Sequence, residues 1–166
     1  HEGPLTFRWV ACDDLYGQKG AFRDGVDDLG LRYVAEVPCS TKVWTERPPL
    51  KGPGPSGGGR PREKWSLDDD APSAVEVQNL AAEATGWEQI RIRKGTKKSI
   101  RSEWVALRVY PWRDGLPGEQ RWLLLERRRS GEHRYYLSNA GPEATKGKMA
   151  HVASAEWFVE QCFREA

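Results

Sequence analysis

The sequence lacks the patterns that mark a disulfide-rich, zinc-binding or membrane protein. Its three cysteines, Cys12, Cys39 and Cys162, have no Cys-x-x-Cys spacing, and their odd number leaves one unpaired. Neither a disulfide framework nor a zinc site is therefore indicated. No apolar run approaches the ~20 residues of a membrane-spanning helix, and no signal peptide precedes the first expected strand. We expect a soluble, cytoplasmic protein in a reducing compartment, with no membrane partner.

The chain also has little net charge, but its charges are unevenly distributed. The formal net charge is +2 over 166 residues. Residues 91–134 carry thirteen Lys or Arg against five acids, whereas residues 1–37 carry more acids than bases. A basic middle beside an acidic end favours a polyanionic partner that approaches the middle. The length fits one domain with an insertion, and the ends at His1 and Ala166 lead us to expect a piece truncated at both ends.

The N-terminal part predicts a βαβ unit. An apolar run over residues 7–12 ends in Asp13 and Asp14, which is typical of a buried strand that breaks into a turn. A helical spacing of apolar residues follows over 20–29, and residues 32–37 have the pattern of a second strand. In such a unit Asp13 would lie at the carboxyl edge of the sheet, where ligands bind. Alternatively, the two acids simply begin the next helix.

The next segment, residues 46–72, is rich in Pro and Gly and is predicted to be a flexible surface loop. Its glycine run lacks the Gly-Lys-Ser/Thr ending of a phosphate-binding loop. The run of acids at residues 68–70 could be imagined as a metal cluster, but we interpret it as solvated charge.

A helix and four strands are expected after this loop. Ser73 and Glu76 have the spacing of a capping box, which predicts a helix from there to Gly86. Strand-like runs follow over residues 89–93, 103–110, 121–126 and 134–138. Their turn-rich connectors predict a meander of antiparallel hairpins.

Arginines, lysines and aromatic residues alternate through this predicted meander. The aromatic residues are interpreted as core, because alternate positions of a strand face the interior. The basic loop is different, since loop cations are free to hold phosphates. Contact with nucleic acid is predicted for Lys94, Lys97, Lys98 and Arg101.

The last expected element is an amphipathic helix from about Lys148 to Ala166. Glu160 lies on a stripe beside the apolar one, so it could face the edge of the sheet. By itself, a Glu on an amphipathic helix is usually a solvated surface residue.

Taken together, residues 9–17, 121–127, 135–140 and 156–163 resemble DDE-type transposases of bacterial insertion sequences. The resemblance implies an RNase H-like catalytic core, related to retroviral integrases, with a β-rich insertion before the last catalytic helix. The expected fold class is therefore α/β (α+β). The expected parts are the βαβ unit over 1–45, the Pro/Gly-rich loop over 46–72, the helix and antiparallel insertion over 73–140, and the last helix over 141–166.

The resemblance also implies the site. Asp13 matches the second catalytic aspartate at an Asp-x-x-Tyr-Gly turn, and Glu160 matches the catalytic glutamate in a Trp-x-x-Glu-x-x-Phe helix. Each would hold one of two Mg²⁺ (or Mn²⁺) ions, which prefer oxygen ligands. The implied activity is metal-dependent phosphodiester hydrolysis and strand transfer at transposon ends. The implied partners are double-stranded DNA, from transposon ends and target, and further copies of the full-length protein in a homo-oligomer.

The sequence departs from the family pattern in three places. The first catalytic aspartate has no counterpart, Glu156 stands where Arg is usual, and a Lys expected on the same helix would fall just past Ala166. Two of three metal ligands are present, so we expect that the chain alone cannot cleave DNA. Two other hypotheses are a non-catalytic DNA-binding remnant that uses the basic β block, and a piece that does not fold stably.

Overall fold

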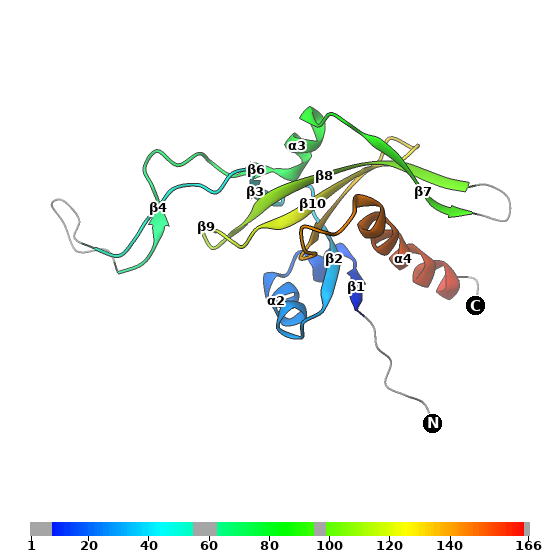
Figure 1. The fold of residues 1–166 in the computed structure, drawn as a ribbon, viewed down its shortest axis with the longest axis horizontal. Coiled ribbons are helices and arrows are strands. Elements are labelled where there is room, and N and C mark those ends of the chain that lie inside the picture. Colours follow the sequence, from blue (N-terminus) through cyan, green and yellow to red (C-terminus); the bar gives the residue numbers. More distant parts are fainter. Residues whose placement is uncertain (1–7, 55–62, 95–98, 165–166) are drawn as a thin grey trace, which may run out of the picture.

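The structure is a computed structural model that describes the backbone of residues 8–54, 63–94 and 99–164. Side chains are described for these residues except 93, 94, 99, 100 and 156–164. The α/β class expected from the sequence is confirmed, because one large mixed sheet carries helices on both of its faces (Figure 1).

The predicted βαβ unit is present at the N-terminal end. Strands β1 (Trp9–Cys12) and β2 (Arg32–Val37) are parallel and are joined by the helices α1 (Asp14–Gly17) and α2 (Gly20–Asp28). The register pairs Cys12 with Ala35, so Asp13 leaves the sheet at the carboxyl edge. Helix α2 covers one face because Phe22 and Val26 pack into the core beneath it.

The antiparallel meander is also confirmed, and it continues the same sheet. Strands β7 (Glu88–Lys94), β8 (Ser99–Arg113), β10 (Arg121–Arg127) and β11 (His133–Ser138) pair successively in antiparallel fashion. The short β9 (Leu116–Pro117) pairs with the end of β8. Strand β11 then pairs with β2, which the sequence patterns did not predict. The inserted strands therefore extend the sheet of the βαβ unit.

The capping box predicted at Ser73 and Glu76 is wrong. Strand β6 (Val75–Glu76) pairs with β3 (Lys42–Trp44), and helix α3 (Val77–Glu83) begins only after it. Glu76 is the N-cap residue, but its side chain makes no capping hydrogen bond. The physical reason is that the backbone groups expected in a first helical turn are used in a strand ladder instead.

The Pro/Gly-rich segment contains more order than the sequence suggested. Strands β4 (Leu50–Lys51) and β5 (Ser66–Leu67) form a separate two-stranded sheet. Lys51 pairs with Asp68 at 3.4 Å and also with Asp69, so opposite charges lie together beside this sheet. Residues 55–62 lie outside the described part.

The full sheet runs in the order β1-β2-β11-β10-β8-β3-β6, with β7 and β9 paired to β8. Leu123 and Leu125 of β10 point to the face covered by α2 and α3, and Leu124 points to the opposite face. That opposite face is covered by helix α4 (Lys146–Arg164) (Figure 1). Among the described residues, no helix is both long and apolar enough to cross a membrane.

Candidate active site

Asp13 is the first residue after β1 and caps the amino end of α1. Its backbone is extended, with φ −69° and ψ 176°, and its Oδ1 accepts a hydrogen bond from the backbone N–H of Tyr16 at 3.2 Å. The interpretation that this acid begins a helix is thus confirmed. Its other oxygen, Oδ2, makes no hydrogen bond to any described residue. The cap therefore leaves one carboxylate oxygen for a ligand.

The turn that carries Asp13 is fixed tightly against β2. A Cβ atom on Gly17 would lie 1.9 Å from the backbone oxygen of Glu36, so only glycine allows this approach. The Arg23 guanidinium donates a hydrogen bond to the Gly17 carbonyl from the next helix. Both contacts hold α1 in place and keep Asp13 at the edge of the sheet.

The surface around Asp13 is a shallow depression of about 320 Å³. It is lined by residues 10–13 together with Tyr16 and Phe22, whose ring centroids lie 5.6 Å apart. Asp13 itself is half-buried. A shallow site of this kind suits a large ligand that lies across the surface better than an enclosed small molecule.

Helix α4, which carries Glu160, lies alongside β1 and β2 (Figure 1). Its first half is fixed by Met149, Ala150 and Ala153, which are buried against the sheet. Glu160 and Glu156 lie in the second half, where side chains are outside the described part. The structure thus brings together the two elements expected to form the site, and the meeting of the two carboxylates remains a prediction.

At the candidate site, Asp13 offers a carboxylate oxygen, which is the kind of ligand that a hard cation prefers. In this part of the chain, no three His, Cys, Asp or Glu side chains cluster closely enough to hold a metal ion. The donor type at Asp13 fits Mg²⁺ or Mn²⁺, and Glu160 would have to supply a second ligand.

Sequence reasoning missed a half-buried carboxylate on β2, Glu36. It accepts a hydrogen bond from Arg134 of β11 at 3.1 Å. Burial raises the pKa of the Glu36 carboxyl, and the nearby charge of Asp14 adds to the rise, while Arg134 opposes it. A single Glu in a strand gives no sequence signal that it will form a half-buried ion pair, because its partner Arg134 lies 98 residues away.

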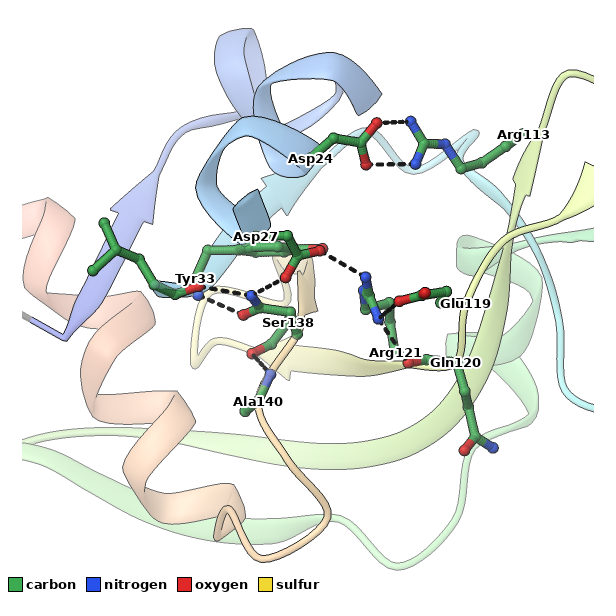
Figure 2. A network of polar contacts seen from close by, with 11 residues as sticks. Asp24, Asp27, Tyr33, Arg113, Glu119, Gln120, Arg121, Ser138 and Ala140 are labelled. Carbon is green, nitrogen blue, oxygen red and sulfur yellow. Dashed lines mark hydrogen bonds and ion pairs between the residues drawn. The ribbon is translucent and has the colours of Figure 1, made fainter. Parts of the chain in front are cut away.

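A polar cleft of about 670 Å³ separates α2 from the end of β8 and the start of β10. Arg113 binds both oxygens of Asp24, at 2.6 and 2.5 Å, and Arg121 binds Asp27 at 2.7 Å (Figure 2). The lining holds equal numbers of cations and acids: Arg23, Arg47, Arg113, Arg121, Asp24, Asp27, Asp28 and Glu119. The ion pairs connect α2 to the sheet across the cleft, and the balanced charges give the cleft no net attraction for a polyanion.

The predicted nucleic-acid loop lies largely outside the described part. Lys97 and Lys98 are not described, and neither is the side chain of Lys94. Arg101 lies on β8, is exposed, and donates a hydrogen bond to Gln89 at 3.2 Å. Arg91 stands directly opposite it on β7 and is also exposed.

Comparison with protein families adds an independent finding. The sequence model of a family described as DDE superfamily endonuclease matches residues 2–99. The match covers more than half of the 166 residues and includes β1, β2 and Asp13. It ends before helix α4. The comparison with curated proteins gives no match.

Proposed function

Because the chain belongs to the DDE superfamily endonucleases, we propose that it provides part of a catalytic centre for metal-dependent hydrolysis and strand transfer at transposon ends. The observation that carries this proposal is the carboxylate of Asp13. It lies directly after β1 at the carboxyl edge of the parallel strand pair, with one oxygen free of hydrogen bonds to described residues. Strand β1 also contacts α4, the helix that carries Glu160, and this contact supports the proposal.

In the proposed mechanism, Asp13 and Glu160 would be the residues that hold Mg²⁺ or Mn²⁺. When bound, the ions would supply an activated water or 3′-hydroxyl and charge stabilisation for the leaving oxygen. The Tyr16 N–H orients the Asp13 carboxylate through Oδ1, and the close contact of Gly17 with β2 keeps the turn rigid. In-line displacement at a phosphodiester depends mainly on such positioning and on charge neutralisation.

The proposed partner is double-stranded DNA at the nucleoid, in the cytoplasm, and the proposed assembly is a homo-oligomer. The resemblance assigns the reaction to three carboxylates, of which Asp13 and Glu160 are two. We therefore expect metal binding by the chain alone, without cleavage. Mg²⁺-dependent nicking of transposon-end DNA by the purified chain, abolished by Asp13→Ala, would contradict this expectation.

The proposal is tested by Mn²⁺ binding, followed by electron paramagnetic resonance of the free ion. We expect Asp13→Asn and Glu160→Gln each to weaken Mn²⁺ binding about tenfold or more, because each removes a charged ligand. The matched control is Asp28→Asn, an exposed acid on α2 that should leave the affinity unchanged. Equal affinities for all four proteins would refute the proposed site.

A second function, DNA binding without catalysis, is favoured by one observation on the β7–β8 hairpin. Arg91 and Arg101 face each other across the ladder, and both are exposed. Like charges at directly opposite positions destabilise a strand pair. A polyanion placed over them would relieve this repulsion, so the hairpin suits contact with a DNA backbone.

This second function is tested by duplex binding at several salt concentrations. Replacing Lys94, Lys97, Lys98 and Arg101 with Gln should weaken binding and reduce the salt slope by about 0.9 for each lost phosphate contact. Arg129→Gln, an exposed arginine in the β10–β11 turn, serves as the control. Unchanged affinity of the fourfold variant would count against DNA binding through this hairpin.

A further inference from the structure

Three segments far apart in the sequence meet at the carboxylate of Asp27 on α2 (Figure 2). Arg121, at the start of β10, binds Oδ2 at 2.7 Å, and Asn139, just after β11, donates its Nδ2 to Oδ1. The sequence separations are 94 and 112 residues. We call Asp27, Arg121 and Asn139 the Asp27 network.

The Asn139 side chain does more than bind Asp27. Its Nδ2 also donates to the Leu31 carbonyl at 2.8 Å, and its Oδ1 accepts from the Tyr33 N–H at 2.7 Å. A side-chain amide has two donor hydrogens and one acceptor oxygen, so every group of this amide is used. Such a fully bonded, half-buried amide holds its residue in one orientation.

These bonds continue the β2–β11 ladder past its last backbone pair. The ladder ends where Ser138 pairs with Val34. At the next position, the Asn139 side chain takes the place of a strand partner for the start of β2, next to Tyr33. The backbone of Asn139 is thereby free to leave the sheet without losing the hydrogen bonds of β2. Asn139 thus marks the point where the chain turns toward α4.

Two further contacts hold the connection between β11 and α4. The Trp122 Nε1–H donates to the Gly141 carbonyl at 3.2 Å, and Arg32 pairs with Glu143 at 2.9 Å. The Arg32–Glu143 pair is exposed, and such pairs contribute little. The start of this connection is therefore held mainly by the half-buried bonds of Asn139 and by the Trp122–Gly141 bond.

We infer that Asn139 is a positioning residue: it fixes where the chain leaves the sheet toward α4, and it acts with the packing of Met149, Ala150 and Ala153 to place α4 against β1. This inference rests on the proposed function, in which Asp13 on the β1 side and Glu160 on α4 must meet at shared ions. Asn139→Ala would leave the Tyr33 N–H and the Leu31 carbonyl without this partner. The exit of the chain toward α4 would then be less well defined, and the two carboxylates would no longer meet in one geometry.

The first measurement is a distance between spin labels on α1 and α4. Labels at Leu15→Cys and Ala155→Cys, both exposed positions, are placed in the full chain after its own cysteines are replaced. We expect one narrow distance distribution in this parent, and a shifted and broadened one in Asn139→Ala. Gln89→Ala, which removes an exposed hydrogen-bonded amide outside the network, should leave the distribution unchanged. Asn139→Asp is the second variant, used if Asn139→Ala does not fold.

The second measurement is Mn²⁺ affinity, which a purely structural role would not change in a folded variant. We expect the Asn139 variants to bind Mn²⁺ about tenfold more weakly, as is usual when a residue that orients a metal ligand is lost. An unchanged label distance in a cooperatively folded Asn139 variant would overturn the inference. A changed distance without any Asp13-dependent Mn²⁺ binding would support the positioning role and refute the proposed function.

Discussion

Asp13 combines a structural and a proposed chemical role in one side chain. One carboxylate oxygen caps α1 through the Tyr16 N–H, and the other is free of hydrogen bonds to described residues. Capping needs only an acceptor oxygen, whereas metal binding needs the negative charge. The two roles can therefore be separated by the choice of substitution.

Substitutions at Asp13 should separate its contribution to the free energy of unfolding from its contribution to metal binding. Asp13→Ala should lower the free energy of unfolding by about 1 kcal/mol, because the cap is lost. Asp13→Asn should change it by less than about 0.5 kcal/mol, because Asn is an equally good N-cap residue. Urea unfolding of the three proteins checks this, and an equal loss in both variants would show that the charge, not the cap, stabilises the turn.

Replacing Gly17 or Gly25 with alanine should change the free energy of unfolding in opposite directions. Gly17→Ala places a Cβ against the Glu36 backbone oxygen and should cost about 3 kcal/mol, since neither backbone can move freely. Gly25→Ala, on α2 with no atom within 4 Å of its added Cβ, should instead stabilise by about 0.5–1 kcal/mol through helix propensity. Chemical unfolding measures both, and a mild effect at Gly17 would mean that α1 is not held closely against β2.

At the scale of elements, α2 is joined to the sheet by charges on one side and by apolar packing on the other. Val26 is buried in the core below the helix. Asp24 and Asp27 meet Arg113 and Arg121 across the polar cleft. These ion pairs are partly exposed, so each stabilises the fold only modestly.

The Asp24–Arg113 pair should make stability depend on pH. The hydrogen bond from Arg113 lowers the pKa of the Asp24 carboxyl from its ordinary value of 3.8. A lowered folded pKa means that the stabilisation is complete above the unfolded pKa and is lost as pH falls through the folded one. Asp24→Asn should thus cost about 0.5 kcal/mol at pH 7 and close to nothing at the acidic end.

The measurement is urea unfolding of wild type and Asp24→Asn between neutral and acidic pH. Asp28→Asn, an exposed acid of the same helix, is the control and should show no such pH-dependent difference. A difference in the free energy of unfolding between wild type and Asp24→Asn that stays constant with pH would contradict an ionised pair.

At the scale of the molecule, the sheet is shared by both core layers. Leu123 and Leu124 are adjacent on β10 and fully buried on opposite faces. The pairing of β11 with β2 joins the inserted strands to the βαβ unit within the same sheet. Loss of either layer should therefore destabilise the other, and the chain should unfold as one cooperative unit.

Leu124→Ala tests this cooperativity. It should lower the free energy of unfolding by about 2–5 kcal/mol, because it leaves a cavity in the layer under α4. Leu29→Ala removes the same atoms from a side chain that is 74% exposed and should change stability by less than about 0.5 kcal/mol. Circular dichroism and tryptophan fluorescence should give coincident transitions. Separate transitions, or none, would favour the hypothesis of a piece that does not fold as a unit.

The sequence by itself determined the elements whose causes are local. The strand before Asp13, the amphipathic α2 and the antiparallel meander follow from apolar spacing and turn residues, and the structure contains all of them. The acid at the strand end was also identified locally, as a helix cap or as a residue at the edge of the sheet where ligands bind, whereas its role as a metal ligand came from the resemblance. Its proposed pairing with Glu160 came from the resemblance, and it stays a prediction.

Only the tertiary structure decided how these elements are joined. The capping box at Ser73 and Glu76 failed because β3, more than thirty residues away, bound the backbone of residues 75 and 76 as a strand. No sequence pattern distinguishes Asn139 from other polar residues, and only the structure shows that its amide bonds to Asp27, Leu31 and Tyr33. Neither periodicity nor propensity carries information about partners that only chain folding brings into contact, so the βαβ unit was predictable and the network that positions α4 was not.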